Sequence, residues 1–252
     1  MTRLQIARPP LEAVIFDLDD TLHDDTATYR RAAERVAHDI ASQRGVPHGP
    51  LFEAYVEAAE RFWSRLDAAT LGSPLAGLRA QMWQQALDSC EFAEPGLAER
   101  CARGYDAYRR DLLELWPGAR ELLASLRERG YKLAMMTNGF AETHRDKIAV
   151  LGLTDAFDEI FIADEVGMVK PDARLFRLAA ERLGVTPEAC AMVGDRFERD
   201  VRGAASVGMY TVWMNVRGET QPGDLQADAV VADLAGVEAA LPLIRQRGSG
   251  FD

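Results

Sequence analysis

Short apolar runs alternate with amphipathic segments along much of this chain. The first run, Val14-Ile15-Phe16, is followed directly by Asp17. Short runs rich in β-branched and aromatic residues are typical of strands that are buried on both faces of a sheet. Comparable runs predict further strands at 132–136, 159–163, 189–193, 210–214 and 229–231. Amphipathic segments between these runs predict helices, which indicates an α/β fold with a parallel sheet covered on both faces.

Residues from about 25 to 115 have a different pattern, in which no segment convincingly predicts a strand. Apolar residues recur there at helical spacing in four stretches, which lie between 29 and 40, 52 and 66, 75 and 87, and 97 and 112. We interpret these faces as the core of a four-helix bundle rather than as a cofactor site. The sequence therefore predicts a helical domain, residues 25–115, inserted into an α/β domain formed by residues 1–24 and 116–252. Beyond Pro242 we expect a mobile tail.

Composition narrows the possible partners. The hydrophobic fraction of 48% and the charged fraction of 27% over 252 residues are those of an ordinary globular protein. A formal net charge of -11 argues against nucleic acid or an anionic membrane as the main partner. No apolar run is long enough to span a bilayer, and the first ten residues do not resemble a signal peptide. The three cysteines, Cys90, Cys101 and Cys190, lack metal-site spacing, which predicts a reduced, cytoplasmic setting.

Two carboxylates follow the first predicted strand, at the sheet edge where open α/β folds bind ligands. Asp17 and Asp19 are two residues apart, so in an extended segment their side chains share a side, roughly 6–7 Å apart. That gap can hold a small tetrahedral group, which one carboxylate attacks while the other handles a proton. Two such anions repel each other, and Mg²⁺, which prefers oxygen ligands, would offset the repulsion. Asp20 points the other way, so we expect a structural role for it; the alternative for the whole stretch is an acidic turn.

Polar residues with possible chemical roles also follow three further predicted strands. Thr137 and Asn138 could donate hydrogen bonds to phosphate oxygens, or could simply cap the following helix. Lys170 could neutralise a transferring phosphoryl group, or could be an exposed lysine before a helix. Asp195 could bind a metal with Asp200 supporting it, or both could belong to a turn. Each of the simpler alternatives is plausible alone, but together the four groups make a complete site for metal-assisted phosphoryl transfer.

At these residues the chain resembles the haloacid dehalogenase (HAD) superfamily over nearly its whole length. The four motifs correspond to Asp17-Leu18-Asp19-Asp20-Thr21-Leu22, Thr137-Asn138, Lys170-Pro171-Asp172, and Gly194-Asp195 with Asp200. The resemblance implies a Rossmann-like three-layer core whose parallel sheet has the strand order 5-4-1-2-3. The helical insert would then be a C1-type cap. In this order the strands that carry Asp17 and Asp195 are neighbours, so both acids could reach one ion.

The resemblance also implies a role for each motif residue. Asp17 would be the nucleophile that forms an aspartyl-phosphate, and Asp19 would protonate the leaving alkoxide and then deprotonate water. Mg²⁺ would be held by Asp17, the main-chain carbonyl of Asp19, and Asp195. Thr137, Asn138 and Lys170 would bind the phosphate. Asp200 would orient Asp195 or hold a water ligand of the metal.

The acid at position 19 favours a phosphatase within the superfamily, because an alkoxide needs a proton to leave whereas a halide does not. We therefore expect a Mg²⁺-dependent phosphatase of small phosphorylated metabolites, such as a nucleoside monophosphate or a sugar phosphate, acting as a monomer or homodimer. The Asp19-Asp20-Thr21 and Thr137-Asn138-Gly139-Phe140 segments resemble the branches of pyrimidine 5′-nucleotidases and N-acylneuraminate-9-phosphatase-like enzymes. A phosphomutase and a catalytically silent HAD-like binding protein are the alternatives. His23 and the Gly72-Ser73-Pro74 loop are candidates for substrate contact, or serve hinge and loop geometry.

Overall fold

The chain divides into two compact units in the computed structural model, which describes residues 9–67, 69–92 and 94–248. One unit combines the residues up to His23 with those from Leu115 onward, and the other spans Asp24–Glu114. The chain leaves the first unit and re-enters it at adjacent points, because His23 and Leu115 form an antiparallel bridge.

The first unit is built on a six-stranded sheet in which every pairing is parallel. Its strands are β1 (Ala13–Phe16), β2 (Lys132–Thr137), β3 (Glu159–Ile162), β4 (Cys190–Gly194), β5 (Tyr210–Met214) and β6 (Ala229–Val231). Their spatial order is β3-β2-β1-β4-β5-β6. This confirms the predicted α/β fold and, seen from the other edge, the order 5-4-1-2-3 of the first five strands. That order is incomplete, because β6 extends the sheet beyond β5.

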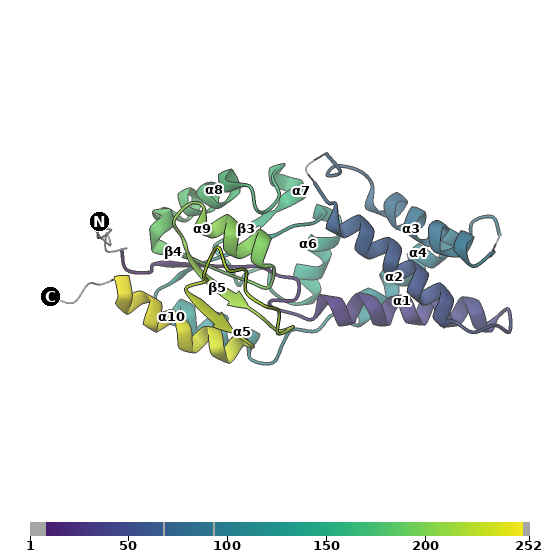
Figure 1. Ribbon diagram of the computed structural model, residues 1–252, viewed down its shortest axis with the longest axis horizontal. Helices are drawn as coiled ribbons and strands as arrows, with labels where there is room; N and C mark the ends of the chain where they lie inside the picture. Colours follow the sequence, from purple (N-terminus) through teal and green to yellow (C-terminus); the bar gives the residue numbers. More distant parts are fainter. Residues whose placement is uncertain (1–8, 68, 93, 249–252) are drawn as a thin grey trace. The chain divides into compact units, whose positions relative to one another are not determined.

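Helices cover both faces of this sheet (Figure 1). They include α5 (Ala119–Glu128) and α10 (Leu234–Gly248) on one face, and α8 (Ala173–Leu183) and α9 (Arg202–Ala205) on the other. The central strand β1 is buried throughout, and its alternate residues Ala13 and Ile15 share an apolar cluster with Phe176 of α8. Burial on both faces explains why the strand has a continuous apolar sequence and not an alternating one.

The C-terminal helix differs from the prediction. We predicted a mobile tail after Pro242. This prediction is wrong up to Gly248, because the helix α10 continues through the proline to that residue. A proline inside a helix removes one hydrogen bond. In α10, Val237, Leu241 and Ile244 are buried, and this packing offsets the loss. The remaining predicted tail, residues 249–252, lies outside the described residues.

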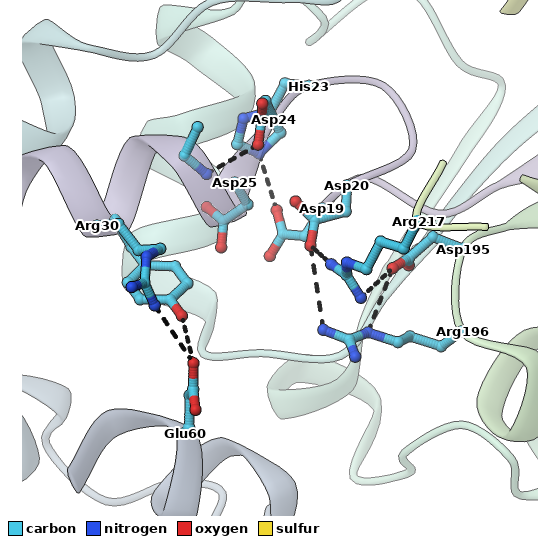
Figure 2. A network of polar contacts seen from close by, with 12 residues as sticks. Asp19, Asp20, His23, Asp24, Asp25, Arg30, Glu60, Asp195, Arg196 and Arg217 are labelled. Atoms are coloured by element: carbon cyan, nitrogen blue, oxygen red, sulfur yellow. Dashed lines mark hydrogen bonds and ion pairs between the residues drawn. The ribbon is translucent and has the colours of Figure 1, made fainter. Parts of the chain in front are cut away.

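The second unit, in its described residues, contains four helices, as the stripes of apolar residues predict. These are α1 (Asp25–Ser42), α2 (Gly49–Ser64), α3 (Leu75–Ser89) and α4 (Leu97–Asp111). Their inward faces form one apolar core, in which Tyr55 and Trp83 stack with ring centroids 3.9 Å apart. Glu60 of α2 accepts a hydrogen bond from Tyr29 of α1. The same carboxylate forms an ion pair with Arg30 of α1 (Figure 2). None of the helices described in either unit is long and apolar enough to cross a membrane.

Candidate active site

The strand order brings the predicted acids to one edge of the sheet. Asp17 follows β1 directly, and its main-chain N–H donates to the carbonyl of Val193 on the neighbouring strand β4. Asp195 follows the end of β4. On the other side of β1, the buried residue Thr137 ends β2, and Asn138 comes next. These positions follow from parallel pairing, which sets the carboxyl ends of adjacent strands side by side.

Three buried carboxylates meet at this edge. Asp17, Asp195 and Asp200 each offer an oxygen within 4.8 Å of the other two. Burial and the neighbouring acids raise the pKa of Asp17 to about 7, although Lys170 opposes the shift. Burial and repulsion from Asp17 and Asp200 raise the pKa of Asp195 to about 8. Hard oxygen donors that repel one another in a buried site suit a small divalent cation, so the residues fit Mg²⁺.

Lys170 is the buried cation of this cluster. Its Nζ lies 2.8 Å from Oδ1 of Asp17 and 2.7 Å from Oδ1 of Asp200. Burial lowers the pKa of Lys170, but the two acids outweigh that effect and raise it. Asn138 fixes the main chain here, because its Oδ1 accepts from the Lys170 N–H at 2.8 Å and its Nδ2 donates to the Lys170 carbonyl at 3.0 Å. The structure thus brings together Asn138 and Lys170, two of the three predicted phosphate-binding residues, with the Asn138 side chain bonded to the main chain of Lys170.

Asp200 is fully buried and closes the loop after Asp195. Its Oδ2 accepts a hydrogen bond of 2.9 Å from the main-chain N–H of Arg196. Gly194 makes room for this carboxylate, since a Cβ at position 194 would lie 2.3 Å from Asp200 Oδ2. Asp200 therefore connects the loop to Lys170 and lies in the carboxylate cluster itself.

Asp19 has a separate environment from the three clustered acids. Its Oδ1 lies 3.0 Å from Nε2 of His23 and contacts Nζ of Lys147, and its Oδ2 lies 3.3 Å from Nε2 of His144. Burial raises the pKa of Asp19, but Lys147 and the two neighbouring histidines outweigh it and hold this pKa well below its usual value. Asp19 is thus surrounded by positive and hydrogen-bonding groups, whereas Asp17 has acidic neighbours.

Two arginines lie beside Asp195 and Asp20 (Figure 2). Arg217 forms an ion pair with Asp20, and its Nη1 lies 3.5 Å from Oδ2 of Asp195. Arg196 places Nε 3.2 Å from the same oxygen of Asp195. Asp20 is buried with these arginines as its partners, which agrees with the structural role expected for it.

Sequence reasoning did not find Lys147, His144 or Arg217. Lys147 and His144 belong to α6 (Ala141–Val150), whose surface-like sequence gives no sign that both side chains are buried. One signal was present: the chain contains 29 basic residues, of which three are lysines, and two of those three contact the site acids. His23 contacts Asp19, as described, whereas residues 72–74 lie in the other unit and their role stays a prediction.

Comparison with known proteins gives consistent matches over most of the chain. A family model described as haloacid dehalogenase-like hydrolase matches residues 11–208. A phosphoserine phosphatase from Thermus thermophilus is 33% identical over 242 residues, which cover 89% of this chain and 96% of the relative. The human N-acylneuraminate-9-phosphatase is 29% identical over 218 residues, which cover 82% of this chain and 84% of the relative.

A solved structure agrees on the fold. The magnesium-bound HAD-hydrolase YfnB from Bacillus subtilis superposes with a TM-score of 0.73, covering 92% of this chain and 99% of that one. The two sequences are 20% identical, so this likeness concerns the fold alone.

Proposed function

We propose that this chain, which belongs to the haloacid dehalogenase-like hydrolase family, is a Mg²⁺-dependent phosphatase that works through an aspartyl-phosphate. Family membership and the phosphatases among its relatives make it a phosphoric monoester hydrolase. The metal and the residue roles are our proposal. One observation supports the metal and the residue roles most directly. Lys170 lies between Asp17 and Asp200, and Asp195 belongs to the same buried cluster.

The roles follow from the chemistry of each group. Asp17 attacks phosphorus and the ester P–O bond breaks. The departing oxygen takes a proton from Asp19, which must acquire that proton as the phosphate dianion binds, because its neighbours favour the ionised carboxylate in the free protein. Asp19 then takes a proton from water as the water attacks the aspartyl-phosphate, which releases phosphate and restores both acids. Lys170 offsets negative charge on Asp17 and on the transferring phosphoryl group. Thr137 binds a phosphate oxygen, and Asn138 keeps Lys170 in place and completes the phosphate contacts.

The carboxylates of Asp17 and Asp195 and the main-chain carbonyl of Asp19 would hold the Mg²⁺. When bound, the ion supplies positive charge to the phosphoryl oxygens and to the acids around it. Asp200 supports this set, either by orienting Asp195 or by holding a water ligand. The buried, mutually repelling carboxylates are the reason that we assign the ion to this place.

Hydrolysis of p-nitrophenyl phosphate tests the function. We expect phosphate release that needs Mg²⁺ and stops with a chelator, whereas a phosphomutase or a silent binding protein would release none.

Asp17→Asn should abolish turnover while the fold is kept, because an amide is a poor nucleophile. Asp155→Asn, in an exposed loop, is the matched control and should keep full activity. Wild-type rates in a clean Asp17→Asn preparation would refute the nucleophile.

The substrate class proposed is small phosphorylated metabolites. The relatives act on different phosphate esters by name, so a screen should include phosphoserine, N-acylneuraminate 9-phosphate, nucleoside monophosphates, sugar phosphates and phosphoglycolate. We propose that the helical unit is the cap that selects among them. The three free cysteines support a cytoplasmic location, and we expect a monomer or homodimer.

A further inference from the structure

We infer that Lys147 is a positioning residue that fixes the Asp19 carboxylate for proton transfer. This inference rests on the proposed phosphatase function, because it assigns a partner to the acid and base of that reaction. Lys147 lies on α6, far from Asp19 in sequence, and none of the four motifs contains it.

The burial of Lys147 is the first observation. Its side chain is 2% exposed, and its Nζ contacts Oδ1 of Asp19. A lysine is almost never fully buried unless it is paired. Lys147 has a flexible stem and a compact ammonium, whereas the other basic residues of this chain are mostly arginines. The buried Lys147 therefore places a compact positive charge at one oxygen of Asp19.

The two histidines complete the hold on Asp19 from other directions. His144 comes one turn before Lys147 on α6, and its Nδ1 lies 3.1 Å from the carbonyl of Phe140 while Nε2 faces Oδ2 of Asp19. Gly139 leaves space for this ring, since a Cβ there would lie 1.9 Å from its Cε1. His23 approaches Oδ1 from the segment that follows Asp19. Each carboxylate oxygen thus has a histidine beside it, and Lys147 supplies the buried charge at Oδ1.

The consequence depends on the leaving group. An alkoxide needs the proton that Asp19 delivers, whereas p-nitrophenolate leaves readily without one. The ratio kcat/KM reports the steps up to departure of the leaving group. A misplaced Asp19 should therefore lower kcat/KM for alkyl phosphates much more than for p-nitrophenyl phosphate. It should also slow hydrolysis of the aspartyl-phosphate, where Asp19 acts as the base.

The test compares Lys147→Met, Lys147→Arg and the control Lys132→Met on both substrate types. For Lys147→Met we expect kcat/KM to fall about 30-fold or more with an alkyl phosphate and less than about threefold with p-nitrophenyl phosphate. Acid-quenched Lys147→Met should contain more covalent phosphoenzyme during turnover of p-nitrophenyl phosphate. Lys147→Arg should recover part of the alkyl phosphate activity. The Nζ of Lys132 donates to the Leu183 carbonyl outside the site, so Lys132→Met should change neither rate.

Equal losses of kcat/KM on the two substrates would overturn the inference, because a purely structural lysine would lower both alike. A crystal structure of Lys147→Met gives a readout that needs no activity. We expect the Asp19 carboxylate to turn away or to lose its single orientation, and an unchanged Asp19 would also overturn the inference. If the wild type hydrolyses no phosphate ester, the proposed function fails, and the crystal structure alone then decides whether Lys147 positions Asp19.

Discussion

Asp20 adopts a backbone conformation that most residues other than glycine adopt only at a cost. Its φ is +58°, in the left-handed region, where the Cβ of an ordinary residue crowds the following carbonyl. Aspartate is one of the few residues that tolerate this region, and here its buried carboxylate also pairs with Arg217. The residue therefore supplies both a turn and an anion that holds an arginine beside Asp195.

A matched pair of substitutions separates these two contributions. Asp20→Gly and Asp20→Ala both remove the ion pair, but only the alanine must adopt the left-handed conformation with a Cβ. We expect Asp20→Ala to be less stable than Asp20→Gly by about 1 kcal/mol in urea unfolding. An alanine variant as stable as the glycine variant would show that the backbone at this position relaxes.

At the scale of elements, the sequence predicted the positions of the strands better than the contacts that the surrounding helices make. The strands lie where short apolar runs predict them, and β5 and β6 have the predicted bounds, because burial on both faces leaves a strong local signal. Local patterns do not encode spatial order, which came from the resemblance to the superfamily. The contacts of α6 were not predictable either, since whether Lys147 is buried depends on what packs over it and not on its helical neighbours.

The end of β4 offers a test of how closely the elements pack around the site. A Cβ at Gly194 would overlap the carboxylate of Asp200, which is fully buried. We expect Gly194→Ala to cost roughly 1–3 kcal/mol in free energy of unfolding, and to lower activity by moving Asp200 off Lys170.

Gly104→Ala is the control for this substitution. Gly104 lies inside α4, and a Cβ there would be 3.6 Å from Val36, an ordinary contact. Because alanine is favoured over glycine in a helix, the free energy of unfolding of this variant should be about 0.5–1 kcal/mol higher than that of the wild type. A Gly194→Ala protein as stable and active as the wild type would show that Asp200 has other positions available.

At the scale of the whole molecule, the carboxylate cluster proposed to bind Mg²⁺ also destabilises the metal-free folded protein. Asp17, Asp195 and Asp200 repel one another in a buried site, and Lys170 offsets only part of their charge. A cation that binds the folded protein and not the unfolded chain stabilises it by mass action. Mg²⁺ should therefore raise the thermal unfolding temperature of the protein as a whole, by an amount that grows with its concentration.

Asp195→Asn tests this relation directly. Without added metal we expect the variant to be at least as stable as the wild type. The amide replaces a carboxyl group whose ionisation is opposed by burial and by two neighbouring acids. With free Mg²⁺ at 100 times its Kd for the wild type, the free energy of unfolding of the wild type should rise by about 2.7 kcal/mol. That of the variant should hardly change. Asp155→Asn should show the full gain, and calorimetry with and without Mg²⁺ measures all three proteins. An Asp195→Asn protein that gains as much as the wild type would place the ion elsewhere, because the carboxylate proposed to hold it would then be dispensable.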